Sequence, residues 1–402
     1  MYHIVFSSSE DYLAYTSVLI TSIVKCAKTN DKLDNNGGGG GNNSHINCAT
    51  NKSTDNIISK ENIESNVIDS NNKPFCFHVI SDFLKPESIE KVNLMQEELN
   101  RIYPCEIRIH IIDDTEFEKL NLPKWGQDEK PKSYATYCRI IFDRFMPRDI
   151  DKILYLDVDM LAIKDIRDIF DIDLKDKVMG AVYHSYCKKE ILTRNPNTHK
   201  NIPIDPLKHY TVSLMLINIK QWREQNIESK IFDLIRTHSS YTGDQDYINV
   251  AVNDTIKIPY KYNCSYLTNQ EITCTDESDT FSMPYTRKEY EESMNDLRII
   301  HYNSNQKAWS SPYTMMKNYI PTFDIQYTKE WWDMAAQTPY FSDVLMERKI
   351  YLDSNELRLY ATSMQKILKE FENKINILET KQNIRKRLSR KLKQIINKIR
   401  GK

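Results

Sequence analysis

The sequence predicts an α/β fold in which helices flank a mostly parallel central sheet, followed by a helical C-terminal extension. Segments with strand and helix patterns alternate from the start to about residue 301, which favours a doubly wound sheet. The runs at 75–80 and 152–156 are almost continuously apolar, as is typical of strands buried on both faces of a parallel sheet. Beyond Trp309 the recognisable segments are helical.

The start of the chain contains the first strand and helix. Ile4–Phe6 predicts the strand, and apolar residues at helical spacing over 12–26 predict the helix, with Ser9 or Asp11 available as its N-cap. From 29 to 73 the chain is rich in Asn, Ser, Asp and Gly, and this stretch holds five of the 9 glycines. A segment of this composition cannot bury a core, so we predict a disordered insertion.

Regular patterns resume after the insertion. Strands are predicted at 75–80, 107–112, 152–156, 178–183, 213–219, 255–258 and 298–301. Helices are predicted at 86–102, 134–145, 329–338 and 354–380. We therefore expect one large α/β domain over residues 1–310 and a helical extension over 311–380.

The end of the chain is a basic amphipathic segment. Residues 381–402 contain ten Lys or Arg and no acid, which leaves 45 basic against 56 acidic residues in 1–380. Its apolar residues recur every three or four positions: Ile384, Leu388, Leu392, Ile395, Ile396 and Ile399. This pattern predicts a helix that lies on an anionic membrane surface. The alternatives are a solvated helix and a helix that contacts a partner helix or a nucleic acid. Because residues 1–380 are acidic overall, the chain is not a uniformly basic nucleic-acid binder.

The cysteines and the hydropathy indicate a compartment. The 8 cysteines are scattered singly, with no CxxC pair, which predicts reduced thiols in a cytosol. No apolar run approaches the roughly 18 residues that a transmembrane helix needs, and the opening run is too short for a signal peptide. With the basic segment, these features predict a cytoplasmic protein attached peripherally to the inner face of a membrane.

Two carboxylates directly follow the apolar run at 152–156. Asp157 and Asp159 flank Val158 where the strand is predicted to end, and ligand sites of α/β sheets lie at the carboxyl ends of strands. Alternate side chains of an extended backbone point the same way, so this DxD motif can place both carboxylates on one hard divalent cation. Read alone, the motif also fits two solvated acids in a turn.

Two further polar segments follow predicted strands or begin helices. His301 comes directly after an apolar strand and six residues before Lys307, a spacing that can supply a third metal ligand and a cation for a diphosphate. A hydrogen-bonded histidine beside a solvated lysine is the alternative. The segment 244–246, Asp-Gln-Asp, follows Gly243 and either lines a sugar pocket or caps a helix.

Taken together and in this order, the segments resemble the family 8 glycosyltransferases, retaining enzymes of the GT-A fold that use a nucleotide sugar. The resemblance runs from Met1 to about Trp309, apart from 29–73. It rests on these motifs: Val5–Tyr12, Thr136–Ile140, Tyr155–Asp159, Leu214–Asn218 with Trp222, Asp244–Asp246, and His301–Trp309.

The resemblance implies a Rossmann-like nucleotide-binding sheet, a UDP-sugar donor and bound Mn²⁺ or Mg²⁺. The implied metal ligands are Asp157, Asp159 and His301. The implied donor-binding residues are Phe6, Ser7, Ser9, Tyr12, Arg139, Asp157, Val158, Asp159, Ser304 and Lys307, with Tyr12 stacked on the base. Asp244 and Gln245 are implied to hold the sugar at the reaction centre.

The activity implied in this way is the metal-dependent transfer of a hexose, from UDP-galactose or UDP-glucose, with retention of configuration. The implied acceptor is a saccharide or glycolipid such as lipopolysaccharide core. Since glutamine is a poor nucleophile, we expect attack on the same face as the departing UDP, with Asp244 and Gln245 positioning the sugar.

The chain departs from the family pattern at several positions. Ser9 stands where the opening often has an aspartate for the uracil ring, and the segment 210–213 reads Tyr-Thr-Val-Ser in place of Phe-Asn-Ala-Gly. His184 stands where many members carry an acid. Ser304 and Ala308 replace Gly and Pro, and a serine limits the backbone approach that glycine permits. These departures leave the base and the sugar open.

Two other functions fit parts of the pattern. A phosphatase of the haloacid-dehalogenase type also places DxD after a buried strand, but Leu161 stands where it usually has Thr or Val. The non-enzymatic alternative is a membrane-associated scaffold with a glycosyltransferase fold.

Overall fold

The computed structural model describes residues 1–35, 73–113, 115–118, 120, 134–184, 186–187, 191–194, 201–205, 207–240, 243–265, 274–276, 281–303, 307–311 and 326–400. The chain divides into two compact units. The first comprises Met1–Cys264, Ile272–Ile300 and Thr338–Tyr340, and the second comprises Ser265–Glu271, His301–Gln337 and Phe341–Lys402. The division falls inside strand β14 (Ile299–His301), which His301 completes.

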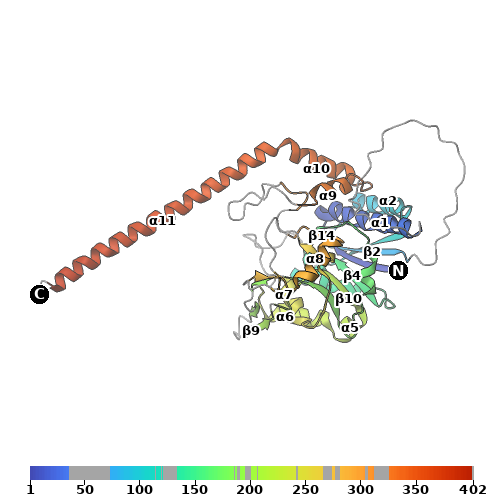
Figure 1. Cartoon of the computed structure of the whole chain (residues 1–402), viewed down its shortest axis with the longest axis horizontal. Helices are drawn as coiled ribbons and strands as arrows, with labels where there is room; N and C mark the ends of the chain where they lie inside the picture. The colour runs from blue at the N-terminus through green and yellow to red at the C-terminus, as the bar shows by residue number, and fades with distance from the viewer. Residues whose placement is uncertain are drawn as a thin grey trace. The chain divides into compact units, whose positions relative to one another are not determined.

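A seven-stranded sheet with the order β11-β6-β10-β4-β1-β2-β3 forms the centre of the first unit (Figure 1). Its strands are β1 (Tyr2–Ser7), β2 (Phe75–Ser81), β3 (Cys105–Ile111), β4 (Lys152–Leu156), β6 (Met179–Tyr183), β10 (Tyr210–Asn218) and β11 (Ile256–Lys257). Strand β1 is parallel to β2 and β4, β2 to β3, and β11 to β6. Strand β10 is antiparallel to β4 and β6. The prediction of a mostly parallel sheet is confirmed.

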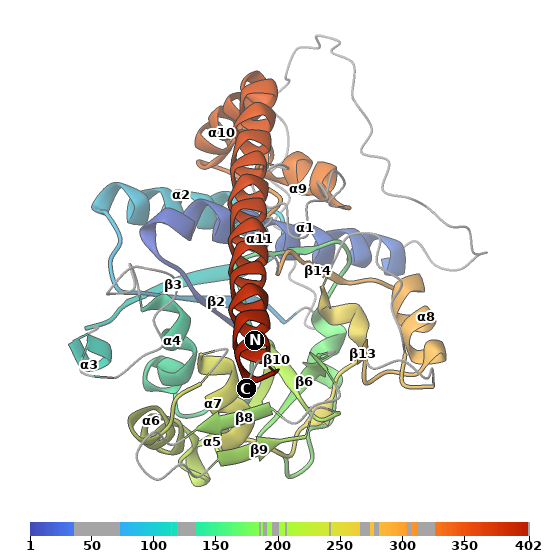
Figure 2. The same cartoon turned by 90° about the vertical axis from the view of Figure 1, so that its left-hand side faces the viewer.

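Helices cover both faces of this sheet, which is why its central strands are mostly apolar. Helices α1 (Leu13–Asn35) and α2 (Pro86–Asn100) lie on one face (Figure 2). The other face is covered by α4 (Ala135–Ile141), α5 (Ile219–Glu224), α6 (Ile227–Thr237) and α7 (Asp244–Ala251) (Figure 2). On that second face Tyr155, Met215, Trp222 and Ile231 belong to one continuous buried core.

Two predicted helices differ from the structure. Helix α1 follows a 3-10 turn at Glu10–Tyr12 and continues to Asn35, so the predicted insertion does not begin at residue 29. The rest of that segment, 36–72, lies outside the described residues. The helix predicted over 134–145 is divided into α4 and a 3-10 turn at Phe142–Phe145.

Shorter elements complete the first unit. A three-stranded sheet has the order β12-β14-β5, so the strand predicted at 298–301 belongs to this small sheet. The remaining elements are α3 (Thr115–Glu118), α8 (Arg287–Asn295), β5 (Met160–Ala162), β7 (Tyr186–Cys187), β8 (Ile191–Arg194), β9 (Asn201–Ile204), β12 (Cys264–Ser265) and β13 (Phe281–Ser282).

The second unit is helical in its described part. It contains α9 (Thr328–Ala335), α10 (Ser342–Ser354) and α11 (Glu356–Arg400). Trp331 and Trp332 are both buried, with their rings edge to face at 4.9 Å. Helix α11 runs without a break through residue 381, where the predicted basic segment begins. Across the residues that the structure describes, no helix has both the length and the apolar character to span a membrane.

Candidate active site

Polar groups of α4, β4, β10 and α7 meet at the edge of the sheet where β4 ends. Because β10 is antiparallel, its amino-terminal half reaches the same edge, and Asp157 N donates to Ser213 O at 2.8 Å. Helix α7 begins beside this edge with Asp244, whose carboxylate contacts Arg139 of α4. Four elements therefore bring polar groups to one place, as expected for the carboxyl ends of strands in an α/β sheet.

Arg139 is buried among these elements and joins two carboxylates. Its Nη2 lies 2.9 Å from Asp157 Oδ1, and its Nε lies 3.0 Å from Asp244 Oδ2. Its Nε and Nη1 also donate to the carbonyls of Thr136 and Val212, at 2.9 and 3.0 Å. These contacts link helices α4 and α7 to the ends of strands β4 and β10. The implied contact of Arg139 with a donor substrate stays a prediction.

Asp244 is the most deeply buried carboxylate of this cluster. Burial raises the pKa of Asp244 to about 6, and the positive charge of Arg139 offsets that rise only in part. Although Arg139 Nε is 3.0 Å from Oδ2, that oxygen accepts no aligned hydrogen bond from the described residues. We therefore regard the pair as a Coulombic contact without good hydrogen-bond geometry.

Asp157 is more accessible than Asp244, since 23% of its side chain is exposed, against 7% for Asp244. Tyr155 donates its hydroxyl proton to Asp157 Oδ1 at 3.3 Å. Burial raises the pKa of Tyr155, so the hydroxyl remains a donor at neutral pH. Because Arg139 and Tyr155 both engage Oδ1, they orient the Asp157 carboxylate.

The structure brings the three predicted metal ligands together. Asp157, Asp159 and His301 each offer one ligand atom, and these atoms lie within 4.8 Å of one another. Carboxylate oxygens suit Mg²⁺ and Mn²⁺, and the imidazole nitrogen adds a donor that transition metals accept. These residues therefore fit a divalent cation such as Mn²⁺.

Gln245 meets a residue that the sequence analysis did not identify. Gly243, with φ 77° and ψ −131°, turns the chain into α7 in a conformation that favours glycine. Beyond it, Gln245 Nε2 lies 3.5 Å from His209 Nε2. Burial lowers the pKa of His209 to about 4, so its neutral ring can accept from the Gln245 amide at neutral pH. His184 is the neighbour of His209 in the backbone, because the N–H of His184 donates to His209 O at 2.9 Å.

Other polar side chains of this region attach α7 to the sheet. Asn249 accepts from Tyr210 N and donates to Tyr210 O, both at 3.0 Å. Asp246 is fully buried and accepts from Ser240 Oγ at 2.8 Å. Asn263 donates to Ser213 Oγ at 2.8 Å. Asp246 thus fits the alternative in which the segment 244–246 stabilises the start of a helix. Gln245 differs from it, because its side chain is half-buried.

The opening loop places its predicted residues differently. The Phe6 side chain is wholly buried and stacks on Phe77 at a centroid distance of 6.1 Å, so only its backbone could reach a ligand. Ser7 is nearly buried at the end of β1, and Ser9 precedes the 3-10 turn. Tyr12 is 39% exposed, and its ring packs edge to face on Tyr15 at a centroid distance of 5.7 Å.

The closing motif belongs to the second unit from His301 onward. Lys307 Nζ donates to Tyr302 O at 2.8 Å, and Tyr302 donates its hydroxyl proton to Tyr327 O at 2.7 Å. The Trp309 and Trp331 rings lie 5.1 Å apart. Ser304 lies outside the described residues. The implied contact of Lys307 with a diphosphate stays a prediction.

Comparison with known proteins identifies the family. The model of the family described as "Glycosyl transferase family 8" matches residues 3–312. The lipopolysaccharide 1,2-glucosyltransferase of Escherichia coli is 28% identical over 253 residues, which are 60% of this chain and 66% of that protein. The lipopolysaccharide 1,3-galactosyltransferase of Salmonella typhimurium is 25% identical over 254 residues, 60% of this chain and 65% of that protein. The chain thus spans just under two thirds of the length of these relatives.

Solved structures support the fold. The apo structure of the bifunctional glycosyltransferase WbbM has a TM-score of 0.56 at 15% identity, covering 86% of this chain and 51% of WbbM. The galactosyltransferase LgtC, solved with donor and acceptor sugar analogues, has a TM-score of 0.50 at 17% identity, covering 84% of this chain and 96% of LgtC. The mostly parallel sheet flanked by helices is the GT-A fold of these neighbours. With the family model matched over most of its length, the chain belongs to glycosyl transferase family 8.

Proposed function

We propose that the protein is a metal-dependent, retaining hexosyltransferase that moves galactose or glucose from a UDP-sugar to a saccharide or glycolipid acceptor. The observation that carries the proposal is the convergence of Asp157, Asp159 and His301 within 4.8 Å, at the edge of the sheet where Arg139 orients Asp157. The names of two relatives, a lipopolysaccharide glucosyltransferase and a lipopolysaccharide galactosyltransferase, support a hexose and a glycolipid acceptor.

Each part of the site has a role in this proposal. Asp157, Asp159 and His301 hold Mn²⁺ or Mg²⁺ against the donor diphosphate. When bound, the ion neutralises negative charge that develops on the departing UDP. The exposed ring of Tyr12 stacks on the uracil, and Lys307 adds positive charge at the phosphates.

The stereochemical part of the proposal rests on Gln245. Its amide nitrogen lies 3.5 Å from neutral His209, a contact that does not make the amide a nucleophile. We therefore favour attack of the acceptor hydroxyl on the same face as the departing UDP, with Asp244 and Gln245 positioning the sugar. Complete loss of turnover in Gln245→Ala, together with a trapped glycosyl adduct in Gln245→Glu, would count against this choice.

The basic segment 381–402 is proposed to attach the enzyme to an anionic membrane. It continues α11, whose Leu368, Phe371, Ile375 and Leu378 are exposed apolar residues spaced three or four apart. Anionic lipid attracts such a segment by about 1 kcal/mol for each basic residue near the surface. This location, at the inner face of a membrane, would bring the enzyme to a lipid-linked acceptor.

Vesicle sedimentation tests the attachment. Truncation before Lys381 is expected to abolish co-sedimentation with vesicles that contain anionic lipid, while hydrolysis of the donor remains intact. Unchanged sedimentation of the truncated chain would refute the attachment without affecting the proposed chemistry.

The enzymatic proposal is tested by UDP release from UDP-galactose, UDP-glucose and UDP-N-acetylglucosamine, with Mn²⁺ and with a chelator. We expect release from one hexose donor only when metal is present. No release and no binding of any donor would favour the scaffold alternative. Hydrolysis of p-nitrophenyl phosphate in place of UDP release would favour the phosphatase alternative.

A further inference from the structure

A second group of metal-binding side chains lies on the first three strands, away from the candidate active site. Strand β2 is buried along its whole length, yet Cys76 and His78 share one of its faces. His3 of β1 pairs in register with Cys76, and His110 of β3 contributes a third imidazole to the same face. Cys76 and His78 are wholly buried and His3 and His110 are half-buried, and such a polar group is unusual on a buried strand, which is normally apolar.

The ligand atoms of this group are already close together. His3 Nδ1 lies 3.0 Å from His78 Nε2, and Cys76 Sγ lies 3.3 Å from the same nitrogen. Ligand atoms of His3, Cys76 and His78 all lie within 4.8 Å of one another. In a tetrahedral zinc site, with Zn–N of about 2.0 Å and Zn–S of about 2.3 Å, neighbouring ligand atoms are about 3.3–3.5 Å apart. Small rotations of these side chains would therefore admit the ion.

We propose that His3, Cys76 and His78 form a zinc site, with water as the fourth ligand. His110 supports the site as a second layer, because its Nε2 lies 3.0 Å from His78 Nδ1. When His78 donates its Nδ1 proton to His110, its Nε2 is free to bind the metal. Metal-binding histidines in proteins are commonly oriented through their other nitrogen in this way.

The donor set selects zinc over the cation proposed for the active site. Thiolate and imidazole ligands suit Zn²⁺, whereas a site rich in carboxylates suits Mg²⁺ or Mn²⁺. Burial lowers the pKa of His3 to about 4 and of His78 to about 3, so both rings are neutral at pH 7. The Cys76 thiol, whose pKa burial raises to about 11, would release its proton when zinc binds.

The surrounding charges tolerate a cation. Arg108 pairs in register with His78, but its guanidinium is engaged by Glu106 at 2.8 Å. The N-terminal ammonium adds a second positive charge near His3, and Asp149 adds a second negative one, so two charges of each sign surround the site. Without metal, the imidazoles and the thiol form only a hydrogen-bonded chain, which is the competing explanation.

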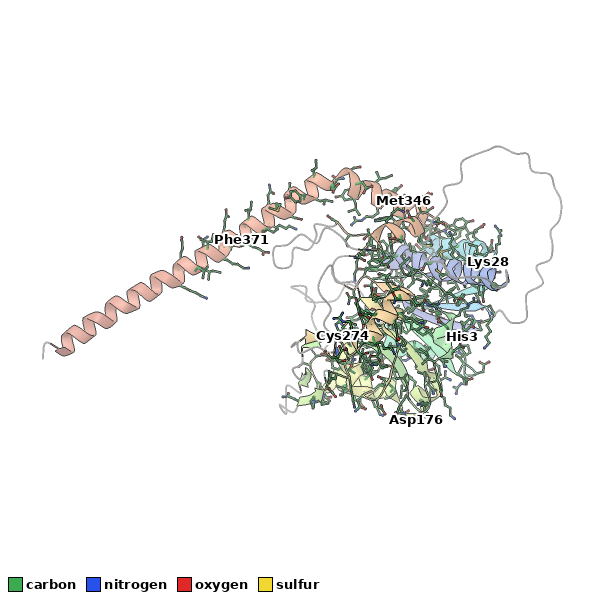
Figure 3. All side chains as sticks on the ribbon, viewed as in Figure 1. His3, Lys28, Asp176, Cys274, Met346 and Phe371 are labelled. Atoms are coloured by element: carbon green, nitrogen blue, oxygen red, sulfur yellow. The ribbon has the colours of Figure 1, made fainter. Side chains whose placement is uncertain are left out.

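The site would be structural and separate from the chemistry. It joins β1 to β2 through residues 75 apart in the sequence, so a bound ion would close a long loop. His3 is labelled in Figure 3. It precedes Ser7, at the end of β1, by four residues. That separation is about 13 Å at the rise of a parallel strand.

Cobalt is the probe for this site, because a thiolate ligand gives Co²⁺ a charge-transfer absorption that carboxylates do not. The full-length protein, prepared without a histidine tag and freed of metal by a chelator, is titrated with Co²⁺. We expect the absorption to saturate at one equivalent, and Zn²⁺ to displace cobalt with at least tenfold higher affinity.

Three variants make the test specific. Cys76→Ser is expected to abolish the absorption. Cys105→Ser is expected to retain it, because Cys105 is also buried in this sheet but pairs in register with Phe75 on the opposite face. Asp157→Ala is expected to retain it as well, which separates this site from the proposed active site.

Other outcomes would overturn the proposal. Absence of the absorption in the wild-type protein, its persistence in Cys76→Ser, its loss in Cys105→Ser, or failure of zinc to compete would leave only a hydrogen-bonded chain. If Cys76→Ser does not fold, His3→Gln provides the test from the partly exposed end of the site, with zinc affinity expected to fall at least 100-fold. Unchanged affinity in that variant would equally refute the site.

Discussion

Replacing Asp244 by asparagine should change how the stability of the protein depends on pH. In the folded chain burial raises the pKa of Asp244 from its ordinary value of 3.8 to about 6. Between these two values the folded state holds a proton that the unfolded state has released, so stability falls as the pH rises. At about 1.36 kcal/mol for each pKa unit, the total loss is about 3 kcal/mol, of which about 2 kcal/mol falls between pH 4 and pH 7.

Asp244→Asn cannot release this proton and should lack that loss. The measurement is urea unfolding of both proteins at intervals from pH 4 to 7.5. Buried histidines such as His209 titrate in both proteins, so the difference between the two free energies of unfolding isolates Asp244. We expect the difference to shift by about 2 kcal/mol in favour of the variant as the pH rises from 4 to 7.

A matched control is Asp176→Asn, since Asp176 is an exposed carboxylate labelled in Figure 3, and its variant should follow the wild-type profile. A difference between wild type and Asp244→Asn that stays constant within about 0.5 kcal/mol would refute the reasoning. In that case Arg139 would compensate the buried carboxylate fully.

Three further predictions concern the residues around the site. His209→Ala removes the partner of the Gln245 amide and should lower kcat about three- to tenfold in the UDP-release assay. His209→Gln should restore most of that rate. Equal rates for both variants would show that the contact between His209 and Gln245 does not contribute to turnover. Gly243→Ala places a side chain at φ 77° and should cost about 1–3 kcal/mol in urea unfolding, and an unchanged midpoint would show that α7 tolerates the substitution. Tyr12→Ala should weaken UDP binding about tenfold or more in calorimetry without changing stability. Phe6→Leu should lower stability by about 1 kcal/mol and leave UDP affinity unchanged. The reverse result would mean that the Phe6 ring binds UDP and the Tyr12 ring stabilises the fold.

The strands of the main sheet could be predicted because each is a short apolar run between polar segments. The direction of β10 could not, because its apolar run over 214–217 has the same appearance in either direction. Pairing with β4 and β6 decides the direction, and this pairing brings Ser213 beside Asp157. The sequence also contains no signal for the division of the helix predicted at 134–145. Phe142, where the 3-10 turn begins, is buried.

The site could be predicted in part. Asp157 and Asp159 have a signal in the sequence, because they directly follow a strand whose end marks the ligand edge of the sheet. His209 has no such signal: a single histidine before a strand acquires its place only when α7 packs on β10. Phe6 stays a predicted donor-binding residue, but its ring is buried against Phe77, so only its backbone could make that contact.

The most direct test of the account compares UDP release with Mn²⁺ by the wild-type protein, Asp157→Asn, Asp159→Asn and the control Asp176→Asn. We expect metal-dependent release by the wild type and the control, and a loss of at least 100-fold in both site variants, because each removes a charge from the proposed metal ligands. Equal rates in all four proteins, or release that a chelator does not affect, would contradict it.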